Sequence, residues 1–300
     1  MRMSRRIILV TTVAVFALGT IAGAQTRITK TLNLSPGGEF VLNSDQGSVT
    51  VSGLSRHGAR LVITSNRERL NKLFEITYLV SPGRVQVTIH RREQSWWFNH
   101  TNLHIDVTVP TQTRLNIRTG GGAIRTSELE GDELLVTSGG SIYVSDLNGR
   151  LTARTSGGPI RLREVTGDAQ LSTSGGPIDV GSLEGSLIAR TSGGPIRIEG
   201  LSGRVDAQTS GGPIDAVLAR GDADGGILET SGGSIHVALD PEVNLEVDAS
   251  TSGGSVTTDL PLRRMGKISR SSFHGLLGSG GALLRLHTSG GSIRITSRHS

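Results

Sequence analysis

The sequence contains no cysteine and few aromatic residues, with Phe, Trp and Tyr together making up 3% of the chain. Without cysteine, no disulfide can staple the fold and no lipid can be attached to a leader cysteine. Beyond residue 119, Tyr143 and Phe273 are the only aromatic residues. Because aromatic side chains fill wide cores, this scarcity favours a narrow interior packed with aliphatic residues.

A long apolar run occurs at the N-terminus, behind three arginines in the first six residues. Residues 7–21 are apolar or small, and Ala22-Gly23-Ala24 fits a cleavage motif before Gln25. We therefore predict a signal peptide over residues 1–24 and an exported protein of the periplasm, the cell envelope or the extracellular space. The alternative is a retained membrane anchor, although the run is short for a bilayer span of about 20 residues. The adjacent arginines also resemble a twin-arginine export signal.

The predicted mature chain has no large excess of basic or of acidic residues. The full sequence has 31 basic and 26 acidic residues, and loss of the three leader arginines leaves 28 against 26. A nearly neutral surface gives no electrostatic reason to expect binding to nucleic acid or to an anionic membrane. We expect neither partner, and no stable membrane span once the leader is removed.

Glycine is abundant, at 42 of 300 residues, and it is periodic. The motif Thr-Ser-Gly-Gly recurs at spacings of 18, 18, 18, 18, 21, 21 and 37 residues, and Thr119-Gly120-Gly121-Gly122 is a degenerate first copy. The serines of the motif are Ser138, Ser156, Ser174, Ser192, Ser210, Ser231, Ser252 and Ser289. A fixed period of this size is typical of a solenoid, in which each unit buries its apolar face by stacking on its neighbours.

Within one repeat the aliphatic residues alternate as in β-strands. The repeat that begins at Pro159 has Ile160, Leu162, Val165, Ala169 and Leu171 at the predicted inward positions. Two short strands fit in each repeat, separated by glycine turns, and no helix fits. We therefore predict an all-β fold, a parallel β-solenoid (β-helix) of about 18-residue coils with an N-terminal antiparallel β cap or accessory sheet.

The paired glycines, such as Gly157-Gly158, are expected to turn the corner with positive φ, where a β-carbon would clash. The threonine before each corner is expected to bond to the next coil.

Outward positions test the stacking, because coils in register place equivalent residues about 4.8 Å apart. One such column reads Arg161, Asp179, Arg197, Asp215, so its charges alternate in sign. Opposite charges on neighbouring strands stabilise a sheet and like charges destabilise it, so the order indicates parallel stacking in register.

The predicted domains are the leader (1–24), the N-terminal β cap and accessory sheet (25–118), and the solenoid (119–300). The cap contains a coil-like segment at 47–54, and four alternating runs at 60–64, 74–80, 84–90 and 102–109 suggest antiparallel strands. The long last spacing predicts a capping excursion at 260–281, either a hairpin or an irregular coil.

These segments resemble the bacterial putative-adhesin family of exported β-helical domains, whose function is largely unknown. The resemblance covers roughly residues 30–300. It is carried by the coil at 47–54, the strand end at 107–110 leading into 115–117, the Thr-Ser-Gly-Gly series and the closing segment 268–295. It implies a β-solenoid at the cell envelope, and it brings no catalytic residues.

Candidate chemistry is sparse. A catalytic serine needs a unique base beside it, whereas the repeated serines share identical contexts, so we assign them to turns and predict no catalytic residue and no cofactor. The Gly-Gly corners lack the lysine and the helix that make a phosphate loop specific.

Two groups of residues invite a metal interpretation. Asp222 and Asp224 lie in a glycine-rich turn and could hold calcium, against the alternative of a solvated turn. His90, His100 and His104 are too far apart along predicted strands to share one ion. We therefore predict no metal site outside the calcium alternative.

Ser95-Trp96-Trp97-Phe98-Asn99 is the one feature that the repeat does not explain. Trp96, Trp97 and Phe98 could contact a partner, because exposed aromatic residues at a hairpin tip mark contact surfaces. Alternatively they pack on the first coil as a hydrophobic plug.

The leading functional hypothesis is a non-enzymatic envelope module, adhesin-like, that binds a cell-surface or envelope protein or a glycan. The alternative is a polysaccharide-acting β-helix enzyme or a carbohydrate-binding protein. The outward acids Asp179 and Asp215 favour the enzyme alternative, but they are two coils apart and interleaved with arginines. An ice- or crystal-binding threonine face is a weaker third hypothesis, because that threonine shares the parity of the core residues.

Overall fold

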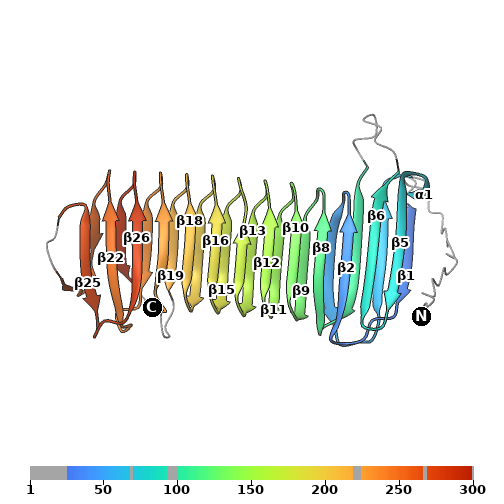
Figure 1. Cartoon of the computed structure of the whole chain (residues 1–300), viewed down its shortest axis with the longest axis horizontal. Coiled ribbons are helices and arrows are strands. Elements are labelled where there is room, and N and C mark those ends of the chain that lie inside the picture. The colour runs from blue at the N-terminus through green and yellow to red at the C-terminus, as the bar shows by residue number, and fades with distance from the viewer. Residues whose placement is uncertain (1–25, 68–69, 93–100, 219–223, 266–268, 299–300) are drawn as a thin grey trace, which may run out of the picture.

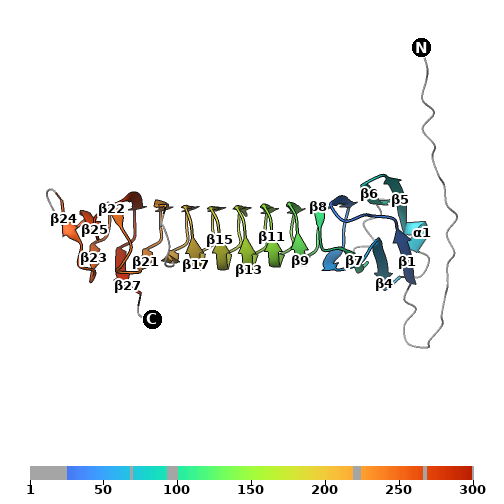
Figure 2. The same cartoon turned by 90° about the horizontal axis from the view of Figure 1, so that it is seen from below.

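The computed structural model describes residues 26–67, 70–92, 101–218, 224–265 and 269–298. They form one elongated sandwich of two long sheets, and each coil of the chain contributes a strand to each sheet (Figure 1). Viewed from below, the coils follow one another along a single axis (Figure 2). The prediction of a parallel β-solenoid is confirmed.

Sheet A has 13 strands and sheet B has 14. The strands of sheet A are β1 (Thr26–Leu32), β3 (Ser48–Leu54), β4 (Ala59–Ser65), β7 (Leu103–Pro110), β9 (Ile124–Glu130), β11 (Ile142–Asn148), β13 (Ile160–Thr166), β15 (Ile178–Glu184), β17 (Ile196–Ser202), β19 (Ile214–Leu218), β21 (Ile235–Leu239), β23 (Val256–Thr258) and β27 (Ile293–Ser297). The strands of sheet B are β2 (Gly38–Ser44), β5 (Phe74–Ser81), β6 (Arg84–Arg91), β8 (Thr113–Thr119), β10 (Glu133–Thr137), β12 (Leu151–Thr155), β14 (Ala169–Ser172), β16 (Leu187–Thr191), β18 (Val205–Thr209), β20 (Gly226–Thr230), β22 (Leu245–Thr251), β24 (Arg263–Arg264), β25 (Ser272–Leu277) and β26 (Ala282–Thr288). A short helix, α1 (Leu70–Leu73), precedes β5.

The core is the aliphatic filling between the two sheets. All five inward residues predicted for the repeat at Pro159 are at most 3% exposed. Each stacks on its equivalent in the next coil, as Ile160 does on Ile178. A coil therefore buries its side chains against its neighbours, as a solenoid requires.

The second glycine of each corner, such as Gly158, has no room for a side chain, but the reason is not the predicted positive φ. Gly158 and its equivalents in the later coils do not have positive φ, whereas the turn glycine Gly167 has a φ of 130°. A β-carbon on Gly158 would lie 2.1 Å from the carbonyl oxygen of Gly140 in the preceding coil. The expectation of positive φ is wrong at this corner, because close stacking of backbone on backbone is what excludes a side chain there.

The threonine ladder is present and runs toward the preceding coil. Thr155 is buried, and its hydroxyl donates to the carbonyl oxygen of Gly140 at 2.8 Å. Thr173 donates in the same way to Gly158 at 3.0 Å. The bond goes to the preceding coil rather than to the next one, and this column of threonines is buried, so it does not form an exposed face.

The alternating charge column is also confirmed. Arg161 lies opposite Asp179, which lies opposite Arg197, which lies opposite Asp215. Asp179 forms ion pairs with both flanking arginines, at 3.2 Å to Arg161 and 3.4 Å to Arg197.

Antiparallel pairing occurs at the N-terminal end, between β1 and β4, β4 and β7, and β5 and β6. On their other sides, β6 and β7 pair in parallel with β2 and β3, and those two strands pair in parallel with β8 and β9. The parallel stacking therefore extends upstream of residue 119.

The C-terminal coil does not stack in sequence order. Strands β26 and β27 lie between the coil of β20 and β21 and the coil of β22 and β23. The excursion between the last two motifs contains β24 and β25, which pair antiparallel with each other, and β25 also pairs antiparallel with β22. The last coil of the chain is thus an interior coil of the stack.

Candidate functional site

An open concave surface is built on three acidic residues at one repeating position of sheet A. Glu128, Asp146 and Glu164 have φ of 59°, 53° and 51°, in the left-handed region. They are skipped in the ladder, because the register passes from Ser145 paired with Ser127 to Leu147 paired with Leu129. Each interrupts the inward–outward alternation of its strand at the same place in its coil, and its side chain is exposed.

The local sequence explains why the alternation is interrupted. Strict alternation would place an inward residue every second position, but in β11 the step from Val144 to Leu147 is three positions, and both residues are buried. A left-handed residue between them restores the inward direction of Leu147. This conformation costs a residue other than glycine about 1 to 2 kcal/mol, which the burial of the following aliphatic residue offsets.

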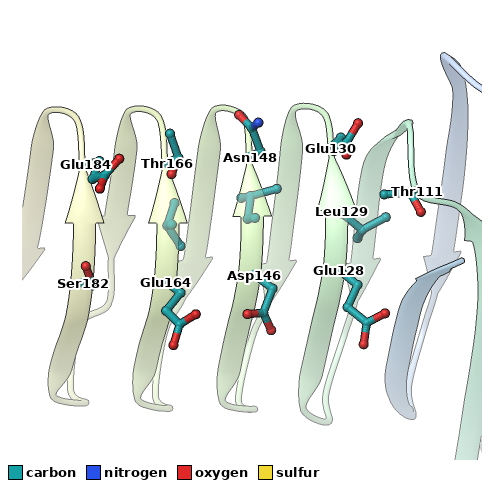
Figure 3. A pocket seen from close by; sticks show the side chains of 12 residues that line it. Thr111, Glu128, Leu129, Glu130, Asp146, Asn148, Glu164, Thr166, Ser182 and Glu184 are labelled. Carbon is teal, nitrogen blue, oxygen red and sulfur yellow. The ribbon is translucent and has the colours of Figure 1, made fainter.

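Together the three left-handed residues line an open groove of about 540 Å³ that crosses several coils (Figure 3). One row consists of Glu128, Asp146, Glu164 and Ser182, and a second row consists of Glu130, Asn148, Thr166 and Glu184. The buried residues Leu129, Leu147 and Val165 separate the rows, and Thr111 closes one end. We call this surface the carboxylate groove.

The groove carries five carboxylates and no cationic side chain among its lining residues. In the part of the chain that the structure describes, none of the five forms an ion pair, although Glu130 accepts a 3.4 Å hydrogen bond from Gln112. Asp179 on the same sheet face is held between two arginines. The groove is therefore a local concentration of negative charge on a chain whose formal net charge is +5.

The repeated serines lie where a turn role predicts. Ser156 and Ser174 are exposed on the corner, and the N–H of Ser174 donates to the carbonyl oxygen of Ser156 at 3.2 Å. Their backbone groups form a ladder that links one coil to the next.

The candidate metal ligands are not brought together in the described residues. No group of three or more His, Asp or Glu residues among them could hold a metal ion. His90 contacts Asp45 at 2.8 Å, and His104 contacts Ser48 at 2.7 Å. The carbonyl oxygen of Asp224 accepts a bond from Arg204 at 3.4 Å, while Asp222 and His100 lie outside the described residues.

The aromatic segment with Trp96, Trp97 and Phe98 also lies outside the described residues. Both of its interpretations, the partner contact and the hydrophobic plug, stay predictions. The signal peptide predicted over residues 1–24 also lies outside the described residues and stays a prediction. Among the residues that are described, no helix has the length and the apolar character of a membrane span.

Sequence reasoning missed the carboxylate groove. The signal was present, because an acidic residue precedes the inward aliphatic residue in Ser127-Glu128-Leu129, in Ser145-Asp146-Leu147 and in Arg163-Glu164-Val165. The three-residue step around each acid marks an interruption of the strand alternation, and the repeat places the three acids in one column.

A second missed residue is Glu133, which lies inside the core. It is 3% exposed and occupies an aliphatic column between Leu115 and Leu151. Thr126 donates to its Oε2 at 2.8 Å, and its Oε1 has no hydrogen-bond partner. Burial raises the pKa of Glu133 to about 8, against the opposite effect of the Thr126 bond.

The sequence matches the model of a family described as Toastrack DUF4097 over residues 38–296. No curated protein matches the chain. The solved structures that the chain matches include a putative adhesin from Bacteroides fragilis NCTC 9343, at 14% identity and a TM-score of 0.44, covering 92% of this chain and 100% of that one. A putative adhesin from Parabacteroides distasonis ATCC 8503 has 12% identity and a TM-score of 0.43, covering 91% and 98%. A putative lipid binding protein from the same organism has 14% identity and a TM-score of 0.40, covering 89% and 96%.

Proposed function

Because the chain belongs to the Toastrack DUF4097 family, which fits the resemblance seen in its sequence, we propose that it is an exported, non-enzymatic, adhesin-like interaction module of the cell envelope. In this proposal the carboxylate groove is part of its contact surface. The family itself carries no assigned chemistry, so the surface geometry has to support the proposal.

The observation that carries the proposal is the shape of the groove. It is open along its length and crosses successive coils, so similar chemical groups recur about every 4.8 Å. Such a surface fits an extended partner with repeated groups, whereas small-molecule sites enclose most of their ligand. The five unneutralised carboxylates favour a partner that presents positive charge, such as a lysine-rich segment of an envelope protein.

The polysaccharide-acting alternative would need an acid and a second carboxylate free to act on a glycosidic bond. Asp179 is engaged in ion pairs with Arg161 at 3.2 Å and with Arg197 at 3.4 Å, so its carboxylate is not free to act on a substrate. Asp215 lies opposite Arg197 in the ladder. The ion pairs of Asp179 and the position of Asp215 beside Arg197 therefore favour a structural role for these acids over a catalytic one.

Export rests on the leader pattern of residues 1–24. The near balance of charge in the mature chain favours a protein or glycan partner over nucleic acid.

Trp96, Trp97 and Phe98 are retained as a second proposed contact, to be tested by replacing both tryptophans with alanine. A loss of partner binding with an unchanged Tm supports the contact, and a large drop in Tm supports the plug.

The groove is tested by titrating the immobilised mature protein with a short oligolysine, with oligoglutamate as the opposite-charge reference. We expect the variant Glu128→Gln/Asp146→Asn/Glu164→Gln to bind oligolysine about 10-fold or more weakly, because each lost surface pair contributes up to about 1 kcal/mol. Binding to the unaltered protein should weaken as salt is added.

The matched control is Glu199→Gln/Asp215→Asn/Glu229→Gln, which removes the same charge from positions outside the groove. It should bind oligolysine like the unaltered protein. Equal losses in the two triple variants would mean that only net charge matters, and the groove would then not be a contact surface.

A further inference from the structure

The four outer edges of the two sheets differ in their protection against another strand. Sheet A ends at β1 and β23, and sheet B ends at β5 and β24. Proteins protect such edges with short strands, charged side chains or proline. Strand β23 has three residues and β24 has two, while β1 carries Arg27 and Lys30. Strand β5 has eight residues, without proline, lysine or arginine.

The outer half of β5 is also apolar and exposed. Leu79 is 56% exposed and Val80 is 51% exposed, the highest values among the large apolar side chains of the described residues. The one charged residue of β5 is Glu75, which forms an ion pair with Arg92 at 3.8 Å. The segment from Ile76 to Ser81 is therefore uncharged and open to a partner.

The hydrogen-bond pattern identifies the backbone groups that face outward. The N–H of Arg92 donates to the carbonyl oxygen of Leu73 at 2.9 Å, at the start of the antiparallel ladder between β5 and β6. Hydrogen-bonded pairs alternate along such a ladder. Counting from Leu73, the residues bonded to β6 are Glu75, Thr77, Leu79 and Ser81. Hence Ile76, Tyr78 and Val80 direct their N–H and C=O groups toward the free edge.

From this arrangement we infer that β5 pairs antiparallel with β5 of a second copy of this chain, about a two-fold axis at Tyr78. Ile76 and Val80 are equally spaced on either side of Tyr78. In this register each Ile76 opposes Val80 of the second copy and the two Tyr78 residues oppose each other, so every outward backbone group on those residues finds a partner. About six hydrogen bonds form across the junction.

The side chains that would face each other across the junction are compatible with this register. Leu79 opposes Thr77 of the second copy, and Glu75 opposes Ser81, so no like charges face each other. Lys30 reaches the Tyr78 ring from β1 in sheet A, 5.9 Å from its centroid, and so lies across the end of the sandwich rather than on the β5 edge. Sheet B would then continue through both copies, and each copy would keep its own carboxylate groove.

The mass in solution tests the pairing, measured by light scattering and sedimentation on the mature protein over a range of concentrations. We expect a dimer for the unaltered protein. Val80→Pro removes an N–H from the free edge without touching the ladder to β6, and Leu79→Lys places a charge on the edge, so both should yield a monomer. Leu54→Lys changes another exposed leucine, 45% exposed on β3, and should remain dimeric.

The register is tested by cross-linking, because the chain has no cysteine of its own. Directly opposed residues of a hydrogen-bonded pair have Cα atoms about 5.5 Å apart, within the range of a disulfide. Tyr78→Cys should therefore form a covalent dimer on mild oxidation, and Thr77→Cys should form far less. A monomer at every concentration overturns the inference, as does a dimer that persists in Val80→Pro and Leu79→Lys or that cross-links equally at both positions.

Discussion

The hydroxyl of Thr251 donates a hydrogen bond to the carbonyl oxygen of Gly291 at 2.7 Å, across 40 positions of sequence. Everywhere upstream in the repeats, the corresponding threonine bonds to a glycine that precedes it, as Thr173 does to Gly158. Thr251 bonds to a later glycine because the last coil of the chain lies between the coil of β20 and β21 and the coil of β22 and β23. Thr288 of the inserted coil bonds in turn to Gly233, at 2.7 Å.

This insertion predicts which corner serines are neighbours. Adjacent coils are about 4.8 Å apart, within disulfide range, and coils separated by one other are about 9.6 Å apart, outside it. Ser231→Cys with Ser289→Cys should therefore oxidise to an intramolecular disulfide, detected as a linked peptide by mass spectrometry. Ser231→Cys with Ser252→Cys should stay reduced. Linkage of the second pair instead of the first would show that the coils stack in sequence order.

The two glycines of one corner should tolerate alanine differently. A β-carbon on Gly176 would lie 2.1 Å from the carbonyl oxygen of Gly158, whereas one on Gly175 would lie 3.7 Å from that of Gly157, an ordinary contact. Gly176→Ala should lower the free energy of unfolding by about 1 to 3 kcal/mol or more, and Gly175→Ala by less than about 1 kcal/mol. Denaturant titration measures both, and equal effects would contradict backbone contact as the reason for the second glycine.

The pH dependence of stability should report on Glu133. Its pKa is raised from 4.5 to about 8 in the folded protein, so the folded state holds a proton that the unfolded chain releases. Its contribution to stability is complete below pH 4.5 and is lost as the pH rises through about 8, at up to about 1.4 kcal/mol per pH unit. Glu133→Gln keeps the size of the side chain and removes the titration.

Compared with the unaltered protein, Glu133→Gln should therefore lose less of its free energy of unfolding between pH 5 and pH 8, as measured by denaturant titration at each pH. Parallel pH profiles for the two proteins would exclude Glu133 as the titrating group. Glu133→Leu with Thr126→Val should raise the Tm at pH 8, because the neighbours in those columns include Leu115, Leu151 and Val144.

Much of the fold could be predicted from the sequence, because the 18-residue period and the alternation of Ile160 and Leu162 fix the strands and their inward faces. The sequence predicts that position 158 requires glycine, but it does not show why. A positive φ and a close contact with a neighbouring backbone both exclude a side chain, so either cause produces the same glycine. The position of the last coil was hidden for a similar reason. The motifs at Ser252 and Ser289 are identical, so sequence alone does not say which one stacks on Ser231.

The carboxylate groove was harder to predict, because Glu128, Asp146 and Glu164 adopt a backbone conformation that usually signals glycine or asparagine. Only the three-residue step between inward residues reveals them. Glu133 was hidden because a glutamate is expected to face solvent, and the register shows that its position is an inward one.

A combined binding and turnover screen of the mature protein tests the proposed interaction module most directly. The protein would be applied to arrayed glycans and to cationic peptides, and incubated separately with acidic and neutral polysaccharides while reducing ends and unsaturated products are measured. The account predicts binding that depends on the carboxylate groove, with no product above that of a heat-unfolded sample. Turnover of any polysaccharide, lost in Asp179→Asn or Asp215→Asn, would contradict it.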